Sequence, residues 1–262
     1  MGFFNFFNRR RKKAEPRGVT PGGSPIYRYG QPESKGFRPP QAFGVYAEAV
    51  TARFSHLFPN RESFVFHELI SDLVHIDVNI LKADEGHDYQ VLYTTGMSDL
   101  PMTLPDDLED REDLRYGELF LFLPADWDLG SAGDLNSNIP EERFWPIRLL
   151  KFLARFPHEY QTWLGWGHTI PNGAQYAPLC PETAMGGVVL SQTAGDLGGL
   201  DTDDGKHINF YMVIPAYKEE IEYKLAKGME ALDEQFSNGA LPMVLDIHRP
   251  NLCAEFTEIL DG

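Results

Sequence analysis

Residues 74–80 read VHIDVNI, a strict alternation of apolar and polar side chains. Such alternation is typical of a β-strand that buries one face, because successive side chains point to opposite sides of a strand. Two segments rich in β-forming residues, Tyr89–Thr95 and Tyr116–Leu123, follow it and predict neighbouring strands. Further strands are expected at Gly187–Ser191, His207–Ile214 and Met243–Ile247.

Three segments have the apolar spacing of amphipathic helices. The first is Gln41–Phe58, the second runs from Glu141 to Phe156 and is stopped by Pro157, and the third runs from about Ala216 to Phe236. In the first segment the apolar residues are Phe43, Tyr46, Val50, Phe54 and Leu57. Strands and helices come in clusters without strict alternation, so we expect an α+β fold in which a mixed β-sheet packs with three main helices in one compact domain.

Charge separates the chain into two parts. The 262 residues include 39 acidic and 23 basic ones, for a formal net charge of −16. Residues 1–40 hold nine of the basic and two of the acidic residues, so residues 41–262 are strongly acidic. The acidic body disfavours nucleic acid and favours a cationic protein partner. The only cysteines, Cys180 and Cys253, are compatible with a reducing compartment, and we expect a cytoplasmic protein.

Residues 1–40 are predicted to be a disordered tail, basic and rich in Phe and Arg at first and then rich in Pro and Gly. The composition of residues 14–40 predicts a tether without a packed element. Residues 1–13 could make weak contact with a membrane surface or dock a partner, or could be an unattached tail. Their Phe residues precede the basic ones, which is not the order of a secretory signal, and no apolar run is long enough to span a membrane.

Two glycine-containing segments lack residues that the catalytic or phosphate-binding motifs they resemble require. The segment Gly96-Met97-Ser98-Asp99-Leu100 resembles a nucleophile elbow except that Leu100 replaces the final glycine. The segment 199–207 lacks the glycine spacing of a phosphate-binding loop, and His207 replaces its hydroxyl residue. We expect no cofactor.

The best set of metal-binding residue types is His67, Glu68, His75 and Asp77. The two histidines are eight residues apart, whereas a helical zinc motif needs them four apart so that they share one face. His75 and Asp77 would project from the same face of a strand. The spacing therefore predicts a polar histidine–carboxylate network and no metal.

Two acidic stretches could attract a basic partner, or could simply be solvated loops. A calcium loop is not indicated, because the second stretch lacks the EF-hand spacing. The candidate residues are Asp106, Asp107, Asp110 and Asp113 in the first stretch and Asp201, Asp203 and Asp204 in the second.

The densest group of polar and aromatic residues lies in residues 158–173. Tyr160, Trp166 and His168 could form the anchor of a partner site, because such side chains combine apolar area with a hydrogen-bonding tip. Glycines on both sides of Trp166 would allow a turn that leaves its indole outside the core. Trp163 is expected to pack inward.

Together several stretches resemble the suppressor-of-fused-like domain family. The similar segments, in chain order, include His67-Glu68-Leu69-Ile70-Ser71, Val74-His75-Ile76-Asp77, Thr95-Gly96-Met97-Ser98-Asp99, Leu123-Pro124-Ala125-Asp126-Trp127, Trp145-Pro146-Ile147-Arg148 and Ile208-Asn209-Phe210. The resemblance spans most of residues 60–250 and makes residues 41–262 the expected suppressor-of-fused-like domain.

The resemblance implies an α+β domain without an established catalytic centre. The animal proteins bind Gli-type transcription factors in Hedgehog signalling, whereas the bacterial single-domain proteins are regarded as immunity proteins of polymorphic toxin systems. This chain is more similar to the bacterial type. The resulting hypothesis is a non-catalytic module that neutralises a basic toxin domain by direct binding. The alternative is a metal-assisted hydrolase around His67, Glu68, His75 and Asp77, and a neighbouring toxin gene would favour the first.

Overall fold

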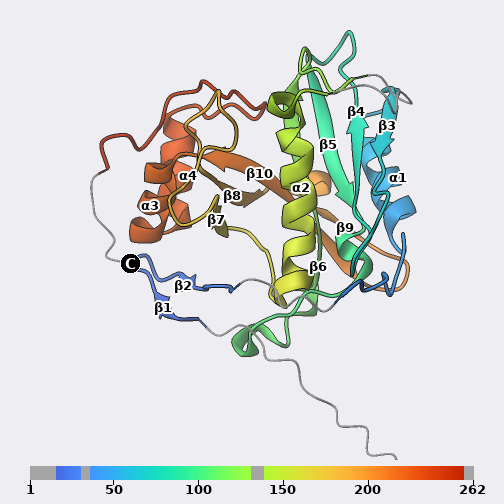
Figure 1. Ribbon diagram of the computed structural model, residues 1–262, viewed down its shortest axis with the longest axis horizontal. Coiled ribbons are helices and arrows are strands. Elements are labelled where there is room, and N and C mark those ends of the chain that lie inside the picture. Colours follow the sequence, from blue (N-terminus) through green and yellow to red (C-terminus); the bar gives the residue numbers. More distant parts are fainter. Residues whose placement is uncertain (1–15, 31–35, 131–138, 257–262) are drawn as a thin grey trace, which may run out of the picture.

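A mixed sheet forms the centre of the computed structural model, which describes residues 16–30, 36–130 and 139–256. Its strands are β3 (Ser63–Phe66), β4 (Asp77–Leu81), β5 (Tyr89–Thr95), β6 (Tyr116–Pro124), β7 (Thr169–Pro171), β8 (Gly187–Gln192), β9 (Gly199–Asp201) and β10 (His207–Ala216). The order is β3-β4-β5-β6-β10-β8-β7, and β9 also pairs with β10 (Figure 1). Only the β6–β10 pair among these is parallel. The predicted α+β class with a mixed sheet is confirmed.

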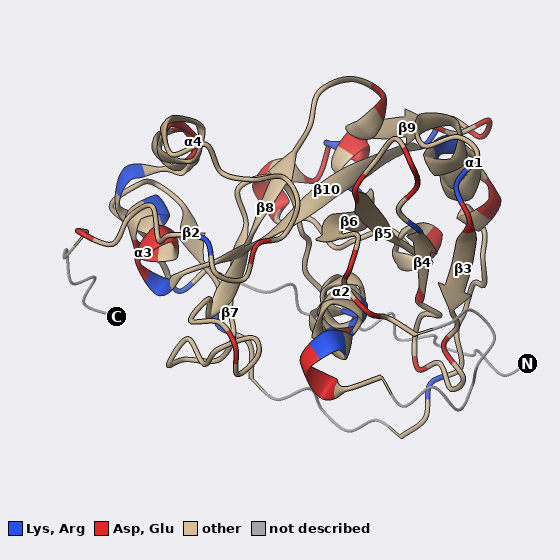
Figure 2. Cartoon of the chain, turned by 90° about the horizontal axis from the view of Figure 1, so that it is seen from above, with Lys and Arg blue, Asp and Glu red and all other residues tan. Residues whose placement is uncertain are grey.

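Helices cover both faces of the sheet. They are α1 (Ala47–Leu57), α2 (Glu141–Tyr160), α3 (Lys218–Lys227) and α4 (Met229–Asn238). Figures 1 and 2 show α2 across one face and α1 on the opposite side. Within β5, Leu92 belongs to the core on the α2 side, whereas Tyr93 stacks on Phe54 of α1 at 4.0 Å between ring centroids. No helix in these described ranges is long and apolar enough to cross a membrane.

The predicted third helix is in fact two helices. It breaks at Gly228, whose φ of 96° lies in a region that side-chain-bearing residues rarely adopt. The apolar periodicity continues through the break, so the pattern alone did not show it. The described part of the chain therefore has four α-helices where three were expected.

Residues 16–30 are packed against the domain. A short hairpin of β1 (Gly18–Val19) and β2 (Pro25–Ile26) places the amide of Gly22 on the carbonyl of Leu225 at 2.9 Å. Farther along, the hydroxyl of Tyr29 is hydrogen-bonded to Thr162 at 2.8 Å. The expectation that residues 14–40 build no packed element is therefore wrong for this part. Residues 1–13 lie outside the described residues, and the boundary at residue 40 stays a prediction.

Pro157 does not stop the second helix, contrary to the sequence prediction. The helix α2 continues to Tyr160 and ends at Gln161, which has a φ of 53°. Proline removes one helical hydrogen bond, but packing of the last turn outweighs that cost. In this turn His158 is buried and bonds the carbonyl of Met97 at 2.8 Å, and burial lowers the pKa of His158 to about 4.

Residues 243–247 do not form the predicted strand. Only Val244 makes a bridge, to Phe122 at the end of β6, and the amide of Leu245 donates to the carbonyl of Phe122 at 2.9 Å. Leu245 and Ile247 are nevertheless buried. The apolar side chains of Leu245 and Ile247 therefore enter the core from a loop and not from a strand.

Candidate functional site

A ten-residue connection between β3 and β4 carries the histidine and carboxylate residues singled out from the sequence. His67 follows β3 directly and Asp77 begins β4. Because the two strands are antiparallel neighbours, with Phe66 opposite Val78, both ends of the connection meet at the same edge. The Nδ1 atom of His67 lies 2.9 Å from Oδ2 of Asp77.

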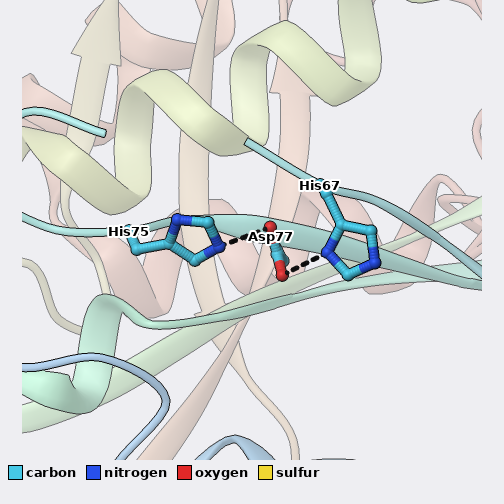
Figure 3. Close-up of side chains that lie close together, drawn as sticks. All are labelled: His67, His75 and Asp77. Atoms are coloured by element: carbon cyan, nitrogen blue, oxygen red, sulfur yellow. Dashed lines mark hydrogen bonds and ion pairs between the residues drawn. The ribbon is translucent and has the colours of Figure 1, made fainter. Parts of the chain in front are cut away.

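The carboxylate of Asp77 lies between two imidazoles (Figure 3). Its Oδ1 atom is 3.0 Å from Nε2 of His75 and accepts a hydrogen bond from the amide of Glu68 at 2.9 Å. The candidate ligand atoms of His67, His75 and Asp77 all lie within 4.8 Å of one another. The predicted polar network is therefore present. Residue spacing did not show that the hairpin register also brings the two histidines to one carboxylate.

Further polar contacts hold this network, which we call the polar cluster (His67, Glu68, His75 and Asp77), in place. Nδ1 of His75 is 2.5 Å from Oγ of Ser71. Glu68 accepts a hydrogen bond from the amide of Ile76 through one carboxylate oxygen and pairs through the other with Arg155 of α2, at 2.5 Å. The cluster is thus tied to α2 as well as to the sheet.

The same region exposes four large apolar side chains. Leu69 is 90% exposed and Ile70 is 80% exposed, and both lie in the connection itself. Phe43, which is 70% exposed, packs its ring against His75 at 4.2 Å, and Val45 is 55% exposed. We call these four residues the apolar loop surface. Phe43 was expected on the apolar face of a helix, but α1 starts only at Ala47.

A buried carboxylate positions the segment that bears Val45. Asp99 accepts hydrogen bonds from the amides of Gly44 and Val45 at 2.6 and 2.8 Å. Burial raises the pKa of Asp99, while these amides favour its charged form. The neighbouring Ser98 is buried and donates its hydroxyl to Glu118 at 2.6 Å. The segment that resembled a nucleophile elbow therefore supports the surface.

The first acidic stretch, residues 106–113, is an exposed loop. It contains two short 3₁₀ turns, Asp106–Leu108 and Glu112–Leu114, and the side chains of Asp106, Asp107, Asp110 and Asp113 all belong to exposed residues. Asp113 pairs with Arg111 through two contacts of 2.9 and 2.7 Å, and this pairing lowers the pKa of Asp113. Arg111 therefore offsets part of the negative charge of this loop.

The second acidic stretch, residues 201–204, forms the turn between β9 and β10. Asp201 pairs with His207 at 2.7 Å, Asp203 is exposed, and Asp204 accepts a hydrogen bond from the hydroxyl of Tyr46 at 2.9 Å. Bonds from Thr202 and Tyr46 lower the pKa of Asp204. Asn209 of β10 donates to the carbonyl of Asp113 at 2.6 Å, so the two acidic stretches lie at the same edge of the molecule.

Tyr160, Trp166 and His168 lie in different surroundings. Trp166 is 42% exposed, as expected from its flanking glycines. The ring of Tyr160 packs on Tyr29 at 5.1 Å between centroids, and His168 packs on Trp163 at 4.3 Å. Burial, with a smaller contribution from the charge of Lys224, lowers the pKa of His168 to about 4, so this imidazole is neutral near pH 7. Trp166 is thus the exposed aromatic residue of the three.

Comparison with known proteins agrees with this architecture. A family model described as Suppressor of fused protein (SUFU) matches residues 72–250, more than half of the chain. A curated relative, the uncharacterized protein UU111 of Ureaplasma parvum, is 22% identical over 186 residues, which cover 71% of this chain and 84% of that protein.

Solved structures of similar fold come from bacteria and animals. A SUFU homologue from Neisseria gonorrhoeae has a TM-score of 0.57 and 14% identity, with coverage of 79% of this chain and 96% of that one. A chain of the Sufu–Fu complex has a TM-score of 0.55 and 17% identity, with coverage of 85% and 100%. Drosophila Suppressor of Fused has a TM-score of 0.52 and 15% identity, with coverage of 82% and 52%. The chain therefore corresponds to about half of the Drosophila protein.

Proposed function

The chain belongs to the Suppressor of fused protein family, and from this membership we propose that it is an immunity protein that neutralises a cognate polymorphic toxin by direct binding. The family is one of protein–protein interaction, and the Sufu–Fu complex is an example in which a homologue binds a protein partner. The family gives no support to the alternative of a metal-assisted hydrolase. An immunity protein of this type would act in the cytoplasm.

The observation that carries this proposal is the apolar loop surface. More than half of each of the side chains of Phe43, Val45, Leu69 and Ile70 is exposed to solvent. Grouped exposed apolar residues are typical of protein interaction sites, because covering them removes apolar area from water. The polar cluster joins the two ends of the connection that bears Leu69 and Ile70, which reduces the conformational entropy that is lost when a partner binds.

Charge favours a basic partner. The formal net charge is −16, and the two acidic stretches, residues 106–113 (the acidic loop) and 201–204, lie at one edge of the molecule. Asp99 and Tyr46 link that edge to the apolar loop surface, since Asp99 holds Val45 and Tyr46 bonds to Asp204. A field of one sign accelerates encounter with a partner of opposite charge. We therefore propose that the acidic residues steer a basic toxin domain toward this face.

The test is binding to the product of a toxin gene adjacent to the gene for this chain. We expect the full chain to bind this product and abolish its toxicity on co-expression. Association should slow, and its salt dependence should flatten, when the acidic loop is neutralised, because steering acts mainly on the association rate. The substitutions are Asp106→Asn, Asp107→Asn, Asp110→Asn and Asp113→Asn. Stopped-flow measurements between about 50 and 300 mM salt, where screening changes appreciably, give the rates.

A variant with the same change in net charge controls for location. It neutralises exposed residues of other elements, through Glu85→Gln, Glu142→Gln, Glu230→Gln and Glu234→Gln. Its association rate should fall less than that of the acidic-loop variant. Equal decreases in the association rate for the two variants would show that the acidic loop has no special role. A chain that neither binds the toxin nor rescues the cells would contradict the proposed function.

Trp166 is expected to be a second anchor for the partner, apart from the apolar loop surface, because it precedes β7 at the opposite end of the strand order from β3. Trp166→Ala should weaken binding about thirtyfold, which corresponds to the roughly 2 kcal/mol typical of an interface hot spot. The unfolding midpoint should change little, because the indole is 42% exposed. Trp145→Ala is the matched control, since Trp145 is buried and its loss should lower the free energy of unfolding by about 3–5 kcal/mol. Unchanged affinity of the Trp166 variant would remove this residue from the interface.

A further inference from the structure

We propose that His67, His75 and Asp77 bind one divalent transition metal ion, of which Zn²⁺ is the representative. The three side chains come from the two ends of the connection between β3 and β4. Their candidate ligand atoms lie within 4.8 Å of one another, and both imidazoles direct a nitrogen toward the same carboxylate (Figure 3).

The donor atoms select the class of metal. Two imidazole nitrogens and one carboxylate oxygen suit Zn²⁺, Cu²⁺, Ni²⁺ and Co²⁺, whereas Ca²⁺ and Mg²⁺ prefer oxygen ligands throughout. Three protein ligands also leave a fourth position of a tetrahedral zinc site for water. His67 lies on the solvent side of the cluster, since its side chain is 68% exposed.

Two of the present distances are close to those between the ligands of a coordinated ion. Nδ1 of His67 and Nε2 of His75 are 2.9 and 3.0 Å from oxygens of Asp77. Two ligands that are each about 2.0–2.1 Å from a tetrahedral zinc ion are about 3.3 Å apart. Each of these nitrogen–oxygen pairs would open by only a few tenths of an ångström, whereas the three ligand atoms as a set, now within 4.8 Å of one another, would have to draw together around the ion. The exposure of His67 leaves that ring free to close on the ion from the solvent side.

The surrounding contacts are of the kind that orient metal ligands. Ser71 contacts Nδ1 of His75 at 2.5 Å, which leaves Nε2 as the nitrogen that faces Asp77. The amide of Glu68 donates to Oδ1 of Asp77 and fixes the plane of the carboxylate. Outer hydrogen bonds of this type commonly set the ring orientation and the basicity of metal ligands.

Two cations on α2 face the site and oppose binding of a further cation. Arg155 is paired with Glu68 at 2.5 Å, so its charge is compensated. Burial lowers the pKa of Lys151, although the carboxylates of Glu68 and Asp77 act in the opposite direction. In the described part of the chain neither cation is a hydrogen-bond partner of Asp77, whose partners are His67, His75 and the amide of Glu68.

A bound ion would join the two ends of the connection that carries Leu69 and Ile70. Closing a loop at its base removes conformations from the intervening residues. Metal would therefore stabilise the presentation of these two apolar side chains, 90% and 80% exposed. Binding of the ion itself does not depend on the proposed immunity function.

The chain contains matched control sites. His87 pairs with Asp84 at 3.0 Å and His207 pairs with Asp201 at 2.7 Å. Among the described residues, a second histidine joins such a pair only at Asp77. If metal binding is lost in His67→Ala and kept in His87→Ala, the ion is therefore bound at the three-residue site.

Isothermal titration of the untagged full chain with Zn²⁺ tests the proposal, with Co²⁺ absorption reporting the ligand geometry. We expect one ion per chain. His67→Ala and His75→Ala should each weaken binding by more than about 100-fold, and Ser71→Ala by about 10–100-fold, the range for an orienting partner. His87→Ala should leave the affinity unchanged. Asp77→Asn keeps the shape of the side chain and should also reduce binding.

A second measurement follows the loop. Zn²⁺ should slow amide hydrogen exchange in residues 67–76 of the unaltered chain and raise its melting temperature, and neither effect should occur in His67→Ala. Because His67 is 68% exposed, this variant is expected to fold. Failure of the unaltered chain to bind Zn²⁺, or equal losses in His67→Ala and His87→Ala, would overturn the proposal. These measurements use no toxin, so their failure leaves the proposed function untouched.

Discussion

Arg249→Met should lower the free energy of unfolding by about 3–5 kcal/mol, the usual cost of leaving a buried charge without its partner. Arg249 forms two contacts of 2.6 and 2.7 Å with Glu220, which is completely buried. The arginine is also buried and donates to the carbonyl of Pro215 at 2.9 Å. Its removal would leave the carboxylate of Glu220 without a cation in the protein interior.

The ion pair also joins three separate parts of the chain. Glu220 accepts hydrogen bonds from the amides of Tyr217, before α3, and Leu252, near the end of the described chain, both at 3.0 Å. Arg249 reaches the end of β10 through Pro215. Loss of the pair should therefore loosen the segment after α4 as well as the start of α3.

Chemical denaturation gives the stability of each variant. The double variant Arg249→Met/Glu220→Leu should be more stable than Arg249→Met alone, because it removes the unpaired charge as well. Arg111→Met is the surface control: its pair with Asp113 is exposed, so solvent screens the interaction and its loss should cost little stability. A loss for Arg249→Met no larger than that of the control would show that the interior accommodates the charge of Glu220.

The sequence predicted most of the strands and helices that alternate or repeat regularly, although β4 begins only at Asp77 and the alternating residues 74–76 precede it. Leu92 and Tyr93 face opposite layers, as strand alternation requires, and the predicted strand Tyr89–Thr95 is found unchanged. Errors occurred where a tertiary contact decided the outcome. Gly228 breaks an otherwise continuous helical pattern, and the packed last turn of α2 carries the helix through Pro157. Neither effect is visible in the periodicity of a single segment.

The candidate site, too, was predicted from the sequence only in part. Composition identified His67, His75 and Asp77 as a polar group, but their meeting depends on the register between β3 and β4. Flanking glycines correctly indicated an exposed Trp166. The exposure of Leu69 and Ile70 was missed, because apolar residues next to a predicted strand are normally assigned to the core. The signal for this surface is the position of Leu69 and Ile70 in a loop.

Gly96→Ala is expected to destabilise the protein by about 2–5 kcal/mol, the sum of backbone strain and overpacking. Gly96 has a φ of 108°, and a Cβ atom there would overlap the carbonyl oxygen of His75, which is backbone and has little room to move. A left-handed backbone costs a non-glycine residue about 1–2 kcal/mol. Overpacking of a tight site adds about 1–3 kcal/mol.

Gly205→Ala separates the two contributions. Gly205 has a φ of 79°, but a Cβ atom there would meet no atom within 4 Å, so its loss should be limited to about 1–2 kcal/mol of backbone strain. The additional loss in Gly96→Ala should be accompanied by displacement of His75, which lies in the polar cluster beneath the apolar loop surface. Denaturation curves measure the first effect, and the nuclear magnetic resonance signals of the His75 ring measure the second. Equal losses in the two variants, with His75 undisturbed, would show that the contact with the His75 carbonyl does not position this site.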